Sequence, residues 1–371
     1  MTTPITRPYL NPAARSWRAE PLRDSPTEFH RSLPGYEPTP LTALPAIAEA
    51  LGVKKVFVKD ESHRLGLPAF KILGASYAIA RALSQRLGAA ATLPLPSLRE
   101  RLGEEQELTL VAATDGNHGR AVAHVAALLG LRSTIYVPEG ISGAAKSAIV
   151  SEGAELVELD LPYDDVVAQA AAHPGEQTIL IQDTSWAGYE DVPQWIVDGY
   201  STMLAEVDAQ LAGRGIEGAD LLVVPAGVGS FAQSVVHHYR STPRHAPALL
   251  IAEPDSAACL TTALHMGRVV PVPTGDTVMT GLTCGTVSQI AWPTLQGGVD
   301  ASVTVTDDQA LSAVSELAAI GVDSGPCGAA TLAALRAVAD QEDLRAALGL
   351  GGETVVVLLS TEGTAANPKT R

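Results

Sequence analysis

The sequence predicts an α/β protein built around mostly parallel β-sheets. Short runs that are apolar throughout and rich in β-branched residues alternate with Ala- and Leu-rich stretches long enough to form helices. Strands without polar alternation are typical of parallel sheets, because helices cover such sheets on both faces. Glycine-containing turns follow several of these strands, as in TDGNHG (114–119) and PAGVGS (225–230). Ligands of open parallel sheets bind beyond the carboxyl ends of the strands, so we expect the functional site there.

The expected elements follow one another in chain order. KVFVKD begins the series as a strand, and the apolar periodicity after it predicts a helix. In the first half of the chain, strands are expected at 55–60, 108–115, 133–138, 155–160 and 178–183, with helices at 70–87, 119–130, 145–153 and, as a long helix, 194–213. In the second half, strands are expected at 221–227, 248–254, 303–307 and 354–360. The polar stretch 96–107 is expected to be a surface loop.

Composition and charge restrict the classes of function. The 371 residues are 46% hydrophobic, which is enough for one large or two medium domains. A formal charge of -16 disfavours binding to nucleic acid and to anionic membranes. We found no apolar run long enough to span a bilayer and no secretory signal at the start. These observations predict a cytoplasmic protein whose partners are small molecules or copies of itself.

The three cysteines do not indicate a disulfide framework or a metal site. Cys259, Cys284 and Cys327 are widely spaced, and none lies in a CxxC or Cys/His zinc pattern. We therefore expect no metal. Whether Cys259 and Cys284 pair is left open by the sequence.

Lys71 occupies an unusual position in DESHRLGLPAFKILGASYA (60–78). It follows Phe70 at the start of a helical pattern and precedes two aliphatic residues. One interpretation is an ordinary helix lysine whose amine extends to solvent. The other is an amine whose pKa is lowered by desolvation, which makes it available to form a Schiff base.

A glycine loop links a strand to a helix in PAGVGSFAQSVV (225–236). The backbone amides near Gly227 and Gly229, the Ser230 hydroxyl and the start of a helix are suited to binding a phosphate monoester. The loop lacks the GxGxxG spacing of a dinucleotide site and the GK[ST] ending of a P-loop, which disfavours NAD and ATP.

Two other strand ends carry polar side chains. In ATDGNHGRAVA (113–123), Asn117 can donate to a cofactor oxygen and Asp115 adds a carboxylate, although both could simply form a turn that caps the next helix. In VVVLLSTEG (355–363), Ser360 and Thr361 follow a buried strand. A neutral hydroxyl facing a pyridine nitrogen would leave that nitrogen unprotonated, which suits elimination better than transamination. A hydroxyl-capped turn is the alternative.

These four motifs, in this order, resemble the fold type II pyridoxal-phosphate enzymes, the superfamily of tryptophan synthase β and threonine dehydratase. Within that superfamily the sequence is similar to the diaminopropionate ammonia-lyases over nearly its whole length. The most similar stretches are VKDES (58–62), AFKILGASYAI (69–79), ATDGNHGRAVA (113–123), YDD (163–165) and QDTSWAGYEDVPQWIVDGYSTM (182–203).

The resemblance implies a role for each matching residue. Lys71 would hold pyridoxal 5'-phosphate as a Schiff base and act as one acid/base, Asp115 would be a second base on the opposite face, and Asp183 would bind the substrate's β-amine. The remaining residues would contact the cofactor: Phe70, Asn117, Gly227, Val228, Gly229, Ser230 and Ser360 or Thr361.

The resemblance also implies an architecture and a reaction. Two open twisted, mostly parallel sheets flanked by helices would form a large domain (1–77 and 184–371) and a small mobile domain (78–183), with the cofactor in the cleft between them and with two copies forming a homodimer. The implied reaction is α,β-elimination of 2,3-diaminopropionate to pyruvate and two ammonia molecules.

Two departures from the family pattern leave the substrate open. Pro68 stands where the family usually has Asn, and DSGPCGAATL (323–332) is closer to serine dehydratases. The alternative is β-elimination or β-replacement on serine, threonine or an activated serine derivative. A non-catalytic binding protein is disfavoured because Lys71 and Asp115 are both present. We expect the aromatic residues Trp186, Tyr189 and Trp195 to pack in the core, with a place in a dimer interface as the alternative.

Overall fold

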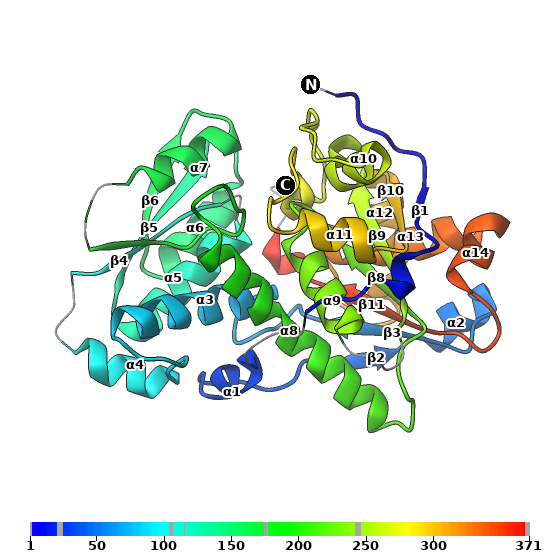
Figure 1. Ribbon diagram of the computed structural model, residues 1–371, viewed down its shortest axis with the longest axis horizontal. Coiled ribbons are helices and arrows are strands. Elements are labelled where there is room, and N and C mark those ends of the chain that lie inside the picture. Colours follow the sequence, from blue (N-terminus) through cyan, green and yellow to red (C-terminus); the bar gives the residue numbers. More distant parts are fainter. Residues whose placement is uncertain are drawn as a thin grey trace. The chain divides into compact units, whose positions relative to one another are not determined.

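The computed structural model describes residues 2–20, 25–103, 107–114, 116–173, 175, 177–241 and 246–367. These residues form two compact units, each assembled from separate parts of the chain (Figure 1). The first unit draws its described residues from Met1–Arg23, Pro38–Ser62 and Met203–Thr364. The second draws them from Asp24–Glu37, His63–Thr202 and Ala365–Arg371.

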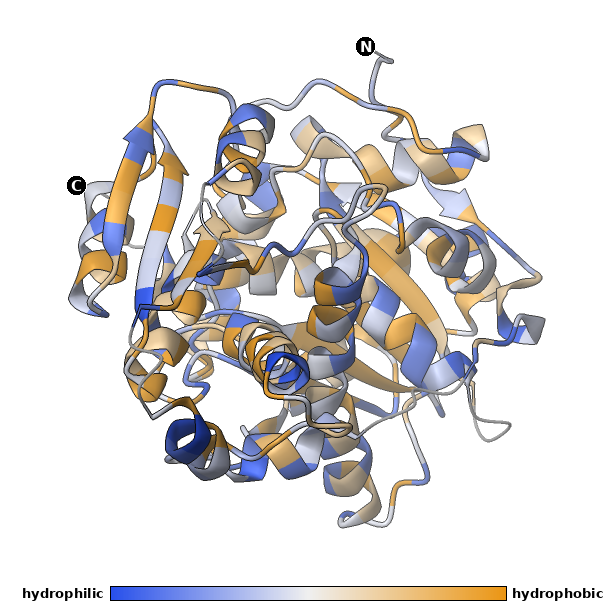
Figure 2. Ribbon diagram, turned by 60° about the vertical axis from the view of Figure 1, so that its left-hand side comes forward, coloured by the Kyte–Doolittle hydropathy of each residue, from blue (hydrophilic) through white to orange (hydrophobic). Residues whose placement is uncertain are grey.

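A seven-stranded sheet forms the centre of the first unit. Its strand order is β1 (Tyr9–Leu10), β10 (Ala301–Val305), β9 (Ala248–Pro254), β8 (Leu221–Pro225), β11 (Val355–Ser360), β3 (Lys55–Asp60) and β2 (Leu41–Ala43). The five inner strands are parallel, and the short edge strands β1 and β2 are antiparallel to their neighbours. Strands β8, β9 and β11 are buried along their whole length, and the strands of this sheet are largely orange in Figure 2.

Helices cover both faces of this sheet. One core cluster joins alternate residues of the strands, such as Leu221 and Val223, to the helices on one face. On the other face, α9 packs against β8 and α11. The helices of the first unit are α2 (Pro45–Leu51), α9 (Ser230–Arg240), α10 (Cys259–Met266), α11 (Trp292–Gly298), α12 (Asp307–Ala319), α13 (Pro326–Ala339) and α14 (Glu342–Leu348), with short 3-10 turns at Ala14–Ser16, Asp255–Ala257 and Thr280–Leu282.

The second unit contains a four-stranded parallel sheet. Its order is β6 (Glu155–Leu159), β5 (Arg132–Pro138), β4 (Thr109–Ala113) and β7 (Thr178–Leu180). Helix α7 packs on β4 and β5 through a cluster that includes Val111 and Val166, while α5 packs against the same two strands and also against α3. The helices of this unit are α1 (Pro26–Arg31), α3 (Lys71–Arg86), α4 (Leu95–Leu102), α5 (Asn117–Leu129), α6 (Gly143–Ser151) and α7 (Tyr163–Ala171).

Two elements continue from one unit into the other. The long helix α8 (Asp191–Ala212) begins in the second unit and ends in the first. The 3-10 turn Thr364–Ala366 likewise crosses the boundary between Thr364 and Ala365.

The predicted fold class is confirmed, and the expected strands are found within a few residues of their predicted ends. The expectation of a loop at 96–107 was wrong for 96–102, because Leu95–Leu102 forms α4, while 104–106 lie outside the described residues. The buried side chains Leu95, Leu98 and Leu102 lie three and four residues apart, so they share one helix face despite the charged residues between them. No helix of the described residues is long and apolar enough to span a membrane.

The compact units and the predicted domains divide the chain at different places. Residues 63–77 and 184–202 belong to the second unit, whereas the sequence assigned them to the large domain. The compact units describe how the chain packs and not how its parts move. A small mobile domain at 78–183 therefore stays a prediction.

Candidate functional site

Lys71 is the first residue of α3, where its amine lies beside the ring of Phe70. Helix α3 is largely buried, since eleven of its sixteen residues are buried. The Lys71 side chain keeps 24% of its surface exposed. Its Nζ lies 5.8 Å from the centre of the Phe70 ring, which in turn packs against Tyr200 at 4.6 Å between ring centres. The amine is therefore held next to aromatic rings while part of it remains accessible.

Asp183 is the direct partner of this amine. Lys71 Nζ donates to Asp183 Oδ2 at 2.7 Å, and the aspartate side chain is only 10% exposed. Burial alone would raise the pKa of Asp183, but the positive charge of Lys71 and the hydrogen bond from its amine are the main causes that lower it to about 2. Asp183 is thus a carboxylate at neutral pH.

His118 is a third titratable residue of this cluster, and the sequence analysis did not single it out. Its Nε2 lies 2.7 Å from the carbonyl oxygen of Ile181, and its Nδ1 lies 4.0 Å from Asp183 Oδ2. Burial lowers the pKa of His118, which favours the neutral ring. A neutral ring that donates from Nε2 to Ile181 turns the lone pair of Nδ1 toward the cluster. The GNHG motif contained this residue, but only the fold places it beside Asp183.

Gln182 is a second residue that the sequence analysis missed. Its fully buried side chain accepts from the backbone N–H of Ala113 at 3.0 Å, so the amide nitrogen must point the other way. That nitrogen donates to the Tyr163 hydroxyl at 3.1 Å and to Asp183 Oδ1 at 3.4 Å. The Tyr189 hydroxyl accepts from the Gln182 backbone N–H at 2.9 Å. Gln182 is therefore locked in one orientation and contacts Asp183.

Asn117 begins α5 at the carboxyl end of β4, as expected for a loop residue at a strand end. The Thr114 hydroxyl accepts from the backbone N–H groups of Gly116 and Gly119 and shapes this turn. A Cβ at Gly119 would lie 2.3 Å from Thr114 Cγ2, so the turn requires glycine there. Strand β4 pairs with β7, which places the turn at the sheet edge where Asp183 also lies. Asp115 lies outside the described residues.

In the first unit, the predicted phosphate loop connects β8 to α9. Gly229 has a φ of +96°, and a Cβ there would lie 2.6 Å from Leu295 Cδ1. A Cβ at Gly227 would lie 2.9 Å from Cys284 Sγ. Val228 accepts a backbone hydrogen bond from Ser288 N–H, and Ser230 opens α9 as a buried residue. Both glycines are thus sterically required in this loop.

Ser360 and Thr361 lie at the end of β11, the strand next to β8 in the sheet. Because parallel neighbours end at the same edge, these hydroxyls and the glycine loop share that edge. The fully buried Ser360 Oγ lies 2.7 Å from Ser324 Oγ. A Cβ at Gly328 of α13 would lie 2.5 Å from Ser360 Oγ, so helix backbone approaches this hydroxyl closely.

These two sets of residues fit the parts of a pyridoxal phosphate molecule. The loop before α9 combines glycines that a Cβ could not replace, a serine and a helix N-terminus, as a phosphate monoester requires. Lys71 carries the kind of primary amine that can bond to an aldehyde, and Ser360 carries a neutral hydroxyl of the kind that can face a ring nitrogen.

Two other expectations concern cysteines and aromatic residues. Cys259 and Cys284 are not joined by a disulfide; Cys259 Sγ contacts the carbonyl oxygen of Gly227 at 3.5 Å. The rings of Trp186 and Tyr189 stack at 4.5 Å between ring centres. Trp195 is half-buried and lines a surface pocket, so its assignment to the core was wrong.

Comparison with known proteins relates the chain to enzymes that use pyridoxal phosphate. A family model described as pyridoxal-phosphate dependent enzyme matches residues 33–361. Diaminopropionate ammonia-lyase from Salmonella typhimurium is 37% identical over 357 residues, covering 90% of this chain and 87% of that protein.

Solved structures agree with these matches. A crystal structure of diaminopropionate ammonia lyase from Escherichia coli in complex with D-serine has a TM-score of 0.87 and 33% identity, covering 98% of this chain and 96% of that one. The structure of the same enzyme in complex with an aminoacrylate-PLP azomethine reaction intermediate has a TM-score of 0.85 and 32% identity, with the same coverage.

Proposed function

This chain belongs to the pyridoxal-phosphate dependent enzymes, and we propose that it is an ammonia-lyase that converts 2,3-diaminopropionate and water to pyruvate and two ammonia molecules. The observation that carries the proposal is the ion pair of the partly exposed Lys71 with the nearly buried Asp183, whose atoms Nζ and Oδ2 lie 2.7 Å apart. It combines the amine that the cofactor requires with a carboxylate that suits a second ammonium group on the substrate.

Pyridoxal phosphate, when bound, withdraws electrons from the substrate's α-carbon and makes the α-proton acidic. Lys71 would bond to its aldehyde carbon. Gly227, Val228, Gly229 and Ser230 would hold its phosphate, Asn117 its phenolic oxygen, and Phe70 would lie at the ring. Ser360 or Thr361 would donate a hydrogen bond to the ring nitrogen, which such a neutral hydroxyl leaves unprotonated.

Lys71 and Asp115 are proposed as the two groups that move protons. The Lys71 amine would remove the α-proton from one face and later protonate the departing amine. Asp115 would act on the opposite face, so that both enantiomers of the substrate could be deprotonated.

Asp183 is proposed to select the substrate through its charge. Its low pKa keeps it negative at neutral pH. A β-ammonium group would gain a hydrogen bond to this carboxylate together with the Coulomb attraction between two opposite full charges. The hydroxyl of serine or threonine would gain the hydrogen bond without an opposite charge, which favours the diamine.

We further propose that the enzyme is a cytoplasmic homodimer whose smaller domain closes during the reaction. Closure of a domain over a reacting carbanion excludes water and suppresses unwanted protonation. The support for dimer and location comes from the resemblance and from the acidic composition.

Product stoichiometry tests the proposed function. The purified, cofactor-loaded protein is given each enantiomer of 2,3-diaminopropionate, serine and threonine, and released keto acid and ammonia are measured. Two ammonia molecules per pyruvate from the diamine, with at least tenfold higher kcat/KM than serine, is the expected result. Higher kcat/KM for serine or threonine would establish the alternative hydroxy-amino-acid activity instead.

The role of Asp115 is tested separately with Asp115→Asn. If Lys71 and Asp115 serve opposite faces, this variant loses activity on one enantiomer much more than on the other. Equal losses on both enantiomers would contradict a second, face-specific base.

A further inference from the structure

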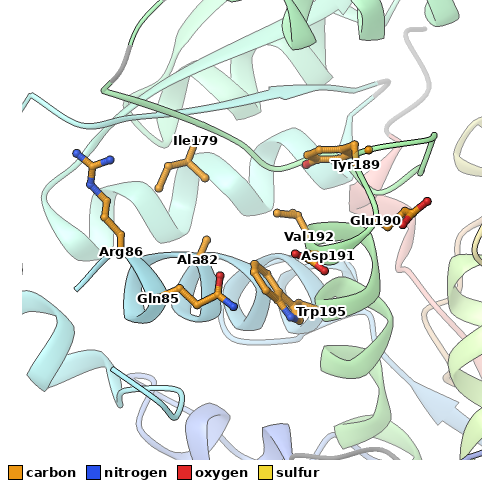
Figure 3. Close-up of a pocket in the computed structure, with 10 residues that line it drawn as sticks. Ala82, Gln85, Arg86, Ile179, Tyr189, Glu190, Asp191, Val192 and Trp195 are labelled. Atoms are coloured by element: carbon orange, nitrogen blue, oxygen red, sulfur yellow. The ribbon is translucent and has the colours of Figure 1, made fainter. Parts of the chain in front are cut away.

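The second unit contains a pocket of about 470 Å³ that is lined by none of the residues assigned to the reaction above. It lies between the end of α3 and the start of α8, with β7 contributing one side (Figure 3). Its volume falls within the range of about 300–1,000 Å³ that is typical of small-ligand sites.

The pocket exists because α3 and α8 diverge. At one end the two helices are in backbone contact: a Cβ at Gly74 would lie 2.6 Å from the Tyr200 ring, and one at Gly199 would lie 2.5 Å from the Leu73 carbonyl oxygen. Further along, long side chains fill the space, and the Arg81 guanidinium lies 5.8 Å from the centre of the Trp195 ring. Beyond that contact lies the pocket, whose lining includes Ala82, Gln85 and Val192.

Charges of opposite sign occupy opposite ends of the pocket. Figure 3 shows Arg86 beside Ile179 at one end, and Glu190, Asp191 and Trp195 at the other. Ala82, Ile179 and Val192 supply apolar surface, and Gln85 adds an amide from the middle of the α3 wall. One guanidinium and two carboxylates give the lining a net charge of -1.

An elongated molecule with a carboxylate, an apolar chain and a distal ammonium group matches this distribution. Arg86, whose Nη2 donates to Gln177 Oε1 at 2.8 Å, would bind the carboxylate in exchange for this hydrogen bond. Ala82 and Trp195 would contact the methylene chain, and Glu190 with Asp191 would bind the distal ammonium. The Gln85 amide oxygen would accept from an α-ammonium group. A basic α-amino acid with a net charge of +1 complements the lining.

We propose that this pocket is a second ligand site, which binds a basic amino acid of the ornithine or lysine class and through it increases the apparent affinity of the enzyme for its substrate. The effect on catalysis rests on the proposed function, but the binding does not.

Hydrogen bonds connect the pocket to the candidate active site. Tyr189 lines the pocket, and its buried hydroxyl donates to the Leu180 carbonyl oxygen at 2.8 Å and accepts from Gln182 N–H at 2.9 Å. Gln182 in turn donates to Asp183. The opposite wall is α3, whose first residue is Lys71. A ligand that fixes Tyr189 and α3 would favour one arrangement of Asp183 and Lys71, because it binds that arrangement better.

Calorimetry with the cofactor-loaded protein tests the binding. L-ornithine and L-lysine are titrated against the wild type and against the double variant Glu190→Gln/Asp191→Asn. Binding is expected in the wild type and at least tenfold weaker in the double variant. L-norvaline, which lacks the distal amine, and 1,4-diaminobutane, which lacks the carboxylate, are expected to bind at least tenfold more weakly than ornithine.

Matched controls distinguish this pocket from the active site. Glu100→Gln, an exposed change on α4 outside the pocket, should leave ornithine binding unchanged, and so should Asp183→Asn. Loss of binding in Asp183→Asn but not in the double variant would place ornithine in the active site and overturn the proposal. Absence of binding in the wild type would overturn it as well.

Kinetics test the coupling. Saturating ornithine is expected to lower KM for 2,3-diaminopropionate at least twofold in the wild type and to have no effect in the double variant, whose activity without ornithine is unchanged. An unchanged KM would overturn the coupling, and a raised KM would indicate competition at the active site. If no substrate is turned over, the proposed function fails while the calorimetric result still decides the ligand site.

Discussion

Lys71 and Asp183 stand 112 positions apart in the sequence, yet Lys71 Nζ donates to Asp183 Oδ2 at 2.7 Å. The carboxylate is nearly buried, so it depends on this ammonium for its charge balance. If Lys71 bonds to the cofactor, as proposed, Asp183 would lose this partner. The β-ammonium of a diamino acid would then restore the charge balance, so the proposed cofactor lysine would influence the choice of substrate.

Lys71→Ala is expected to abolish the visible absorbance of the cofactor-loaded protein and to lower kcat by roughly 10³-fold or more, because both the Schiff base and an acid/base are lost. Lys71→Arg retains the positive charge beside Asp183 but cannot form the Schiff base. It should therefore keep the stability of the wild type while lacking absorbance. Retained absorbance in either variant would rule out Lys71 as the cofactor lysine.

Asp183→Asn is expected to alter the pH dependence of stability in the cofactor-free protein. The pKa of Asp183 is about 2 in the folded protein and 3.8 in the reference state. Because the folded pKa is depressed, this group contributes about 2 kcal/mol that is fully present above about pH 5 and is lost progressively as the pH falls through 3.8 toward 2. Urea-denaturation midpoints measured from pH 7 down to pH 3 check this.

The matched control for that experiment is Glu353→Gln. Lys54 and Glu353 form an ion pair of similar length, 2.6 Å, but Glu353 is 89% exposed. Exposed ion pairs are screened by water and contribute little. A shift of the midpoint in Glu353→Gln as large as in Asp183→Asn would show that burial is not the reason for the effect.

Gln182→Glu is expected to move the acidic limb of the kcat/KM profile to higher pH. The new carboxylate would lie beside Asp183 Oδ1, and two neighbouring carboxylates raise the pKa of one of them. Gln182→Leu instead removes the acceptor of the buried Ala113 N–H and should destabilise the protein by about 1–3 kcal/mol. An unchanged acidic limb in Gln182→Glu would exclude a positioning role toward Asp183.

Gly229→Ala is expected to weaken cofactor binding at least tenfold, measured by titrating the cofactor-free protein with pyridoxal phosphate. The residue has a φ of +96°, and its new methyl group would lie 2.6 Å from Leu295 Cδ1. Adding Leu295→Ala removes the clash but not the backbone strain, so only part of the affinity should return. Gly143→Ala, where the added methyl group has no atom within 4 Å, is the control that should bind normally.

Much of the fold was accessible from local patterns. The parallel sheets followed from strands that are apolar throughout, such as 221–225 and 355–360, because only burial on both faces tolerates such runs. Helix α4 was missed because the three leucines of its buried face are matched by three consecutive charged residues, Arg99 to Arg101. Strand order was also beyond local patterns, since β11, at the end of the chain, lies between β8 and β3.

By itself, the sequence determined which residues stand at strand ends and helix starts: Lys71 at the start of α3, the glycines before α9, and Ser360 after a buried strand. These positions are local consequences of turn chemistry and apolar periodicity. Only the tertiary structure decided that Asp183 pairs with Lys71, that His118 and Gln182 surround it, and that α3 and α8 diverge into a second pocket. Such contacts depend on how elements far apart in the chain pack against one another. A local sequence pattern does not specify which distant elements will meet.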